Sequence, residues 1–94
     1  MTQSLTGPVA REIEEKLRAA LSPTRLAVIN DSAKHHGHAG DDGSGESHFS
    51  VDIVSERFAG MSRVERQRAV NTALADLLRD RIHALSIKAR APGE

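Results

Sequence analysis

The chain of 94 residues has 13 Lys plus Arg against 13 Asp plus Glu, so its bulk charge gives no argument for binding to nucleic acid or to a membrane surface. It has no cysteine, which excludes disulfides and any iron–sulfur or zinc-thiolate site that this chain builds alone. Five histidines are present, and imidazole is a common metal ligand whose charge changes near neutral pH.

The length suits one small domain with a modest core, built from Val, Ile, Leu and Ala because the chain has two Phe and no Trp or Tyr. The first residues lack the basic and apolar regions of a signal peptide, and no apolar stretch is long enough to span a bilayer. We therefore expect a single soluble, cytoplasmic domain over residues 1–94, ordered from about 8 to 92.

The first predicted element is an amphipathic helix from about Pro8 to Leu21, in which an apolar residue recurs every four positions among charged ones. Thr6 is its expected N-cap, Pro8 suits the first turn, and Ser22-Pro23 ends it.

Two strands are expected next, on either side of a polar loop. Leu26–Asn30 is short and β-branched, and every second residue of His48–Ile53 is apolar. Residues 33–47 are rich in Gly, His and acids, which predicts a flexible loop longer than a hairpin turn.

A short turn and a long helix follow. Ser55 is the expected cap of a helical turn over Glu56–Ala59 that Gly60 stops. Ser62 and Glu65 then match a capping box, and the apolar stripe behind it predicts one helix to about Arg81.

The last predicted element is a strand over His83–Ala89, whose alternation places His83 on the core-facing side. The resulting order, α-β-β-α-α-β, predicts an α+β domain: a three-stranded sheet with helices on one face.

The histidines are candidate metal ligands, each with an ordinary alternative. His35 and His38 lie three residues apart in the loop, but structural zinc sites usually need four ligands, so a solvated loop explains them equally well. His83 could instead be a partly buried structural residue. His48 points to the face opposite Phe49, where we expect it only to decorate the sheet.

The segment Phe58–Arg63 has the outline of a helix-turn-helix, because a tight turn with a glycine joins a short helix to a long one. DNA binding through it would use Arg63, Arg66 and Arg68. Acidic residues interleave with these arginines, which argues against clustered phosphate contacts. No nucleophile–base pair or carboxylate dyad is evident, so we expect no enzymatic activity.

Five segments, in order and spacing, resemble the BolA-like family; they are Leu26–Ser32, the loop histidines, Ser47–Ser55, Arg57–Ser62 and Ile82–Ile87. The resemblance covers about residues 8–92 and implies the small α+β fold related to type II KH domains. Two departures are that Gln67 stands where the family often has histidine, and that the Gly-x-x-Gly clamp of RNA-binding KH domains is missing.

The resemblance also implies a function. In the family, histidines at the positions of His83 and His35 serve a 2Fe-2S cluster shared with a monothiol glutaredoxin, whose cysteine and bound glutathione supply the thiolates. His38 is the alternative loop ligand, and His36 has no clear family counterpart. Bacterial BolA proteins are also described as DNA-binding transcriptional regulators, which gives the alternative function. Alone, the chain is expected to be a monomer or weak homodimer that carries no cofactor.

Overall fold

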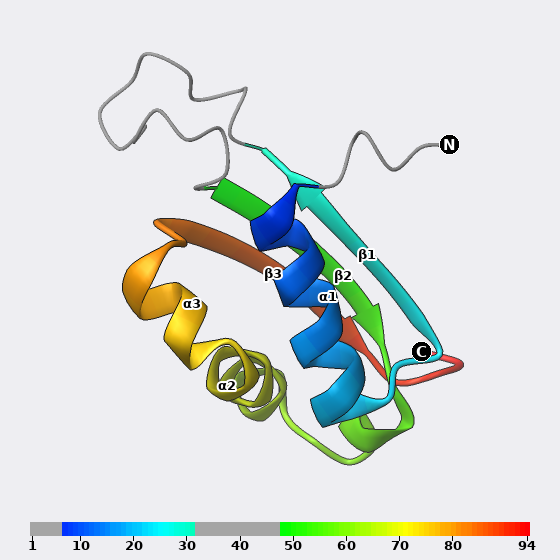
Figure 1. Ribbon diagram of the computed structural model, residues 1–94. Coiled ribbons are helices and arrows are strands. Elements are labelled where there is room, and N and C mark those ends of the chain that lie inside the picture. The colour runs from blue at the N-terminus through cyan, green and yellow to red at the C-terminus, as the bar shows by residue number, and fades with distance from the viewer. Residues whose placement is uncertain (1–6, 32–47) are drawn as a thin grey trace, which may run out of the picture.

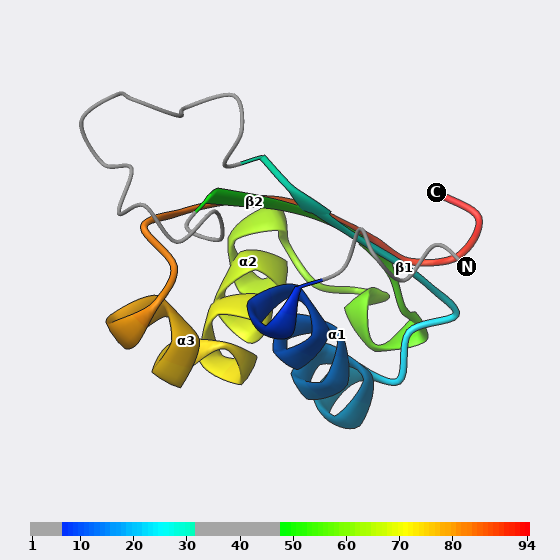
Figure 2. The same cartoon turned by 45° about the horizontal axis from the view of Figure 1, so that its top comes forward.

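Helices cover one face of a three-stranded sheet, and none of the described helices lies on the other face (Figures 1 and 2). The computed structural model describes residues 7–31 and 48–94. The elements in chain order are α1 (Pro8–Leu21), β1 (Arg25–Asn30), β2 (His48–Val54), the 3-10 helix η3 (Glu56–Phe58), α2 (Arg63–Ala73), α3 (Ala75–Asp80) and β3 (Ala84–Arg90). The predicted α+β class and three-stranded sheet are confirmed, whereas the relation to KH domains stays a prediction.

Strand β2 is the centre of the sheet. It pairs antiparallel with β1, where Asn30 lies opposite Phe49, and parallel with β3, where His48 lies opposite Ala84. Parallel neighbours begin at the same end of a sheet. The first residue of β2 and the residues just before β3 therefore lie close together.

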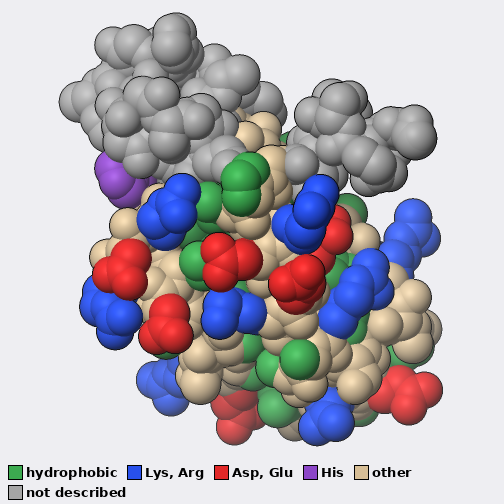
Figure 3. All heavy atoms as spheres, in the orientation of Figure 1, with side chains coloured by type: hydrophobic (Ala, Val, Ile, Leu, Met, Phe, Trp, Pro, Cys, Tyr) green, Lys and Arg blue, Asp and Glu red, His purple; other side chains and the backbone are tan. Residues whose placement is uncertain are grey.

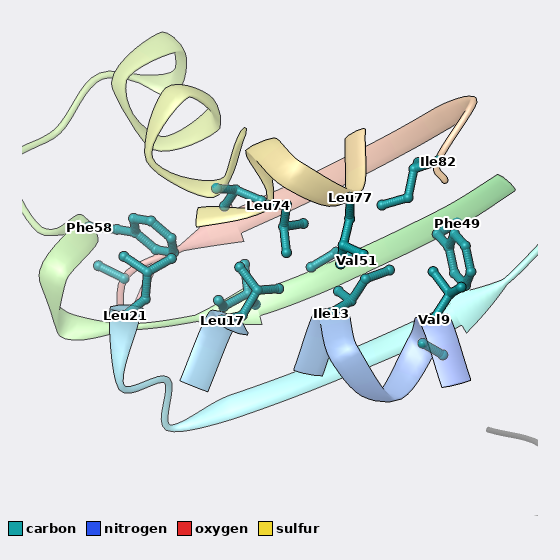
Figure 4. Packing of buried hydrophobic residues seen from close by; sticks show 14 residues of the cluster. Val9, Ile13, Leu17, Leu21, Phe49, Val51, Phe58, Leu74, Leu77 and Ile82 are labelled. Carbon is teal, nitrogen blue, oxygen red and sulfur yellow. The ribbon is translucent and has the colours of Figure 1, made fainter. Parts of the chain in front are cut away.

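The core lies between α1, the inner face of the sheet and the helices α2 and α3 (Figure 4). Ile13 and Leu17 of α1 are fully buried, as is Ile53 of β2, so the two predicted apolar patterns face each other. Burial of each such side chain stabilises the fold by roughly 1.5–3 kcal/mol relative to exposure. The remaining buried apolar residues are Val9, Ala10, Leu21, Phe49, Val51, Phe58, Val70, Leu74, Leu77, Ile82 and Ala91.

Helix α1 has the predicted bounds, but its N-cap is Gly7, without a side-chain cap. The predicted cap, Thr6, lies outside the described residues. The capping box that begins α2 is confirmed: the Glu65 N–H donates to Ser62 Oγ at 3.1 Å, and the Ser62 N–H donates to Glu65 Oε1 at 2.8 Å. Before it, Gly60 adopts the positive φ of 81° that allows the turn.

The prediction of one helix from Arg63 to about Arg81 is wrong, because the chain leaves helical geometry at Leu74, with φ −108° and ψ 15°. No Gly or Pro marks this break. Leu74 is fully buried and Leu77 nearly so, at 5% exposure, so the break lies in the part of the chain that packs into the core. Tertiary packing thus overrides local helix propensity.

The predicted start of the last strand is also wrong by one residue, since β3 begins at Ala84. After α3, the N–H groups of Arg81 and Ile82 both donate to the Leu77 carbonyl, at 2.7 and 2.8 Å, and Ile82 takes the buried position with 4% exposure. His83 therefore lies in the bend before the strand, and it is exposed rather than facing the core.

Candidate functional site

Two histidines meet at the end of the sheet where β2 and β3 begin. The ring centroids of His48 and His83 are 6.2 Å apart, and the ring planes make an angle of 67°, an edge-to-face arrangement. His83 is exposed in the bend before β3, and His48 is half-buried as the first residue of β2. The parallel register brings them together, because His48 lies opposite Ala84, the residue after His83.

This end of the sheet is held by polar contacts from the end of β1. The Asp31 N–H donates to the His48 carbonyl at 2.7 Å, and the hydroxyl of Ser50 donates to Asp31 Oδ2. A shallow hollow of about 220 Å³ lies here, lined by Asp31, His48, Phe49, Ala84, Leu85 and Ser86. These contacts hold the backbone of His48, which lines the hollow and whose ring lies beside that of His83.

The loop histidines His35, His36 and His38 lie outside the described residues. The loop that carries them leaves β1 after Asp31 and enters β2 at His48, and both of these residues are at the same end of the sheet as His83. Both ends of the histidine-containing loop are therefore anchored beside the His48–His83 pair.

The two imidazoles of this site could bind a metal ion, but they do not make up a complete set of ligands. Within residues 7–31 and 48–94, no group of three His, Cys, Asp or Glu side chains is placed to hold a metal ion. Two neutral imidazoles offer two nitrogen ligands, and the chain has no thiol to add. Further ligands would have to come from the loop or from another molecule.

Sequence reasoning did not identify His48 as part of this site. Its alternation with Phe49 correctly predicts a side chain on the sheet face opposite the core. The neighbouring His83 follows only from the parallel pairing of β2 with β3, and no residue pattern near His48 indicates that pairing.

The three arginines predicted for DNA contacts have different surroundings. The side chain of Arg66 is only 14% exposed, and its guanidinium forms a bidentate ion pair with Glu94 at 2.5 and 2.8 Å. It also donates to the carbonyls of Met61 at 3.1 Å and Ala89 at 3.3 Å. Arg63 and Arg68 are exposed. Much of the hydrogen-bonding capacity of Arg66 is thus used inside the molecule.

The ion pair perturbs both partners. Hydrogen bonding from Arg66, aided by the Ala91 N–H, lowers the pKa of Glu94 from 4.5 to about 2. The same hydrogen bond to Glu94 raises the pKa of Arg66. Both shifts favour the charged forms, as expected of a bidentate guanidinium–carboxylate pair.

The segment with a helix-turn-helix outline has a very short first helix, since η3 has three residues. The face of the molecule formed by the helices carries acidic and basic side chains side by side (Figure 3). This mixed charge resembles an ordinary solvated surface more than a phosphate-binding patch.

The chain is similar to known proteins over nearly its whole length. A sequence profile described as BolA-like protein matches residues 17–94. BolA-like protein 1 of Homo sapiens is 48% identical over 88 residues, which cover 94% of this chain but only 61% of that protein, so the chain spans less than two thirds of its length. The DNA-binding transcriptional regulator BolA of Vibrio cholerae is 51% identical over 75 residues, or 80% of this chain and 67% of that one.

Among solved structures, the BolA domain of SufE1 from Arabidopsis thaliana matches with a TM-score of 0.82 and 41% identity, over 92% of this chain and 94% of that domain. The region matched by the profile includes every described element except the first turns of α1. Within the described residues, no helix is long and apolar enough to cross a membrane.

Proposed function

The chain belongs to the BolA-like family, and from this premise we propose that it is a non-enzymatic adaptor that binds a monothiol glutaredoxin and shares a 2Fe-2S cluster with it. His83 and a loop histidine, His35 or His38, would be its ligands. Its role would lie in iron–sulfur trafficking or in iron and redox regulation.

One observation carries this proposal: the exposed His83 lies beside His48 at the end of the sheet to which both ends of the histidine loop are anchored. An exposed imidazole can reach a metal cluster held by another protein without any unfolding of the strand that follows it. The loop histidines lie in the chain between Asp31 and His48, and both of these residues are at this end of the sheet.

The absence of cysteine fits a shared site rather than a complete one. Fe–S clusters are held mainly by thiolates, which this chain cannot supply, and imidazole in place of thiolate raises the reduction potential of such clusters. When bound, the cluster would supply electron-transfer and iron-sensing chemistry. The residues of this chain would supply one or two neutral nitrogen ligands and a surface for the partner.

The test is the visible absorption spectrum of the chain mixed with a monothiol glutaredoxin, glutathione, iron and sulfide. We expect a spectrum different from that of the glutaredoxin homodimer. His83→Ala should remove the difference, whereas the control His36→Ala, which deletes an imidazole without a family counterpart, should keep it. An unchanged spectrum for His83→Ala would rule out the ligand assignment.

A second function, DNA binding, is supported by the similarity to a Vibrio cholerae protein named a DNA-binding transcriptional regulator. The exposed Arg63 and Arg68 at the start of α2 would contact phosphates. Replacing either with Ala should weaken binding and lower the salt dependence by about one counterion. No binding of the wild type to duplex DNA near physiological salt would exclude this as a direct activity.

A further inference from the structure

Strand β3 forms one edge of the sheet, and its outward backbone groups are only partly satisfied. The Arg90 carbonyl accepts from the Ser55 N–H at 3.0 Å, so the backbone of Arg90 faces β2. Because these groups alternate along a strand, those of Leu85, Ile87 and Ala89 point away from the sheet.

Two contacts cover the far end of this edge. Arg66 donates to the Ala89 carbonyl at 3.3 Å, and Glu94 accepts from the Ala91 N–H at 3.0 Å. No residue in the described part of the chain hydrogen-bonds to the outward groups of Leu85 and Ile87. An edge of this kind is a template for another strand.

A groove of about 440 Å³ runs beside the edge, between β3 and the start of α2. Apolar surface comes from Met61 and Ile87, both half-buried. Arg63 on one side and Lys88 on the other are exposed, and neither forms an ion pair with any described residue. Arg66, which also lines the groove, is neutralised by Glu94. The groove therefore carries two positive side chains without an ion-pair partner among the described residues.

We propose that the β3 edge and this groove bind an acidic peptide segment in extended conformation, which pairs with β3 as a fourth strand. The unpaired N–H and C=O groups around Ile87 recognise a peptide backbone, as in other cases of strand addition. Side chains on one face of the added strand contact Met61, and acidic side chains reach Arg63 and Lys88. A nucleic acid could also bind the positive side chains, but its backbone has no alternating N–H and C=O groups to pair with those of the β3 edge.

This site is separate from the one proposed for the metal cluster. His83 precedes the first residue of β3, whereas the groove lies along the second half of the strand, from Ile87 to Ala89. Failure of either proposal leaves the other intact.

The probe is an N-acetylated, C-amidated heptapeptide of alternating Glu and Val, titrated into the isotope-labelled chain and followed by NMR. Amide exchange should slow at Ile87 and Ala89, whose N–H groups point outward, with little change at Lys88 and Arg90, which already face β2. Protection at the His48–His83 end alone, or no protection at saturation, would overturn the proposal.

Two sets of variants test the recognition. Arg63→Glu combined with Lys88→Glu should weaken binding by about tenfold, in the range of exposed charge pairs, whereas Arg79→Glu on α3 should not. Peptides N-methylated at odd or at even positions should differ, since only one set of amides faces β3. Equal binding by both peptides would refute strand addition, as would an oligothymidylate that binds the groove while the peptide does not.

Discussion

The imidazole rings of His48 and His83 lie edge to face, with their centroids 6.2 Å apart, at the end of the sheet where the parallel strands β2 and β3 begin. Neither histidine is near the other in sequence. The parallel pairing of β2 with β3 brings them together, so two imidazole rings lie at one end of the sheet.

The choice between the two loop histidines can be decided by single substitutions. We expect His35→Ala to change the absorption spectrum of the cluster formed with a monothiol glutaredoxin, since the family resemblance assigns this position, and His38→Ala to leave it as in the wild type. The opposite pattern would assign His38 as the ligand. If neither substitution has an effect, the loop supplies no ligand.

The Arg66–Glu94 ion pair should make stability depend on pH in acid. The folded-state pKa of Glu94, about 2, lies below its ordinary 4.5, so the stabilisation is complete above the unfolded value and is lost as the pH falls from 4.5 toward 2. Urea unfolding across this range should show a steeper loss for the wild type than for Glu94→Gln. The exposed Glu12→Gln serves as control. Identical pH profiles for wild type and Glu94→Gln would contradict the assignment.

Phe58, the last residue of η3, is fully buried in the core, so its truncation leaves a cavity. Phe58→Ala should lower the free energy of unfolding by about 3–5 kcal/mol. Val64→Ala is the matched control, because Val64 is 54% exposed and should change stability by no more than about 0.5 kcal/mol. Denaturant unfolding followed by circular dichroism measures both. A loss for Phe58→Ala no larger than the control's would show that the site repacks.

Ser55 is a fully buried polar residue with a structural role. Its hydroxyl donates to the Leu21 carbonyl at 2.6 Å and accepts from the Arg57 N–H at 3.1 Å, so as the N-cap of η3 it links that helix to the end of α1. Ser55→Ala should cost about 1–3 kcal/mol, because it leaves a buried carbonyl unsatisfied. Ser86→Ala on the exposed face of β3 should cost little. Equal unfolding midpoints for the two variants would mean that water replaces the lost hydroxyl.

The elements follow closely from local patterns. The four-residue recurrence of apolar residues predicts α1 with its observed bounds, and Ser62 with Glu65 predicts the capping box of α2, because both depend on residues within one or two turns of each other. The break at Leu74 has no local signal. It lies at a fully buried residue, Leu74, where packing in the core outweighs local helix propensity.

The sequence by itself determined the α+β class and the family resemblance, since periodicity, caps and motifs are properties of neighbouring residues, and His83 as a ligand stays a prediction from that resemblance. Only the tertiary structure decided that His48 lies beside His83, that Arg66 is held by Glu94, and that β3 leaves an edge open next to Arg63 and Lys88. Each of these joins distant segments through the parallel pairing of β2 with β3 and the packing of α2 against β3. Such pairings are selected by burial of the whole core, and no short stretch of residues encodes them.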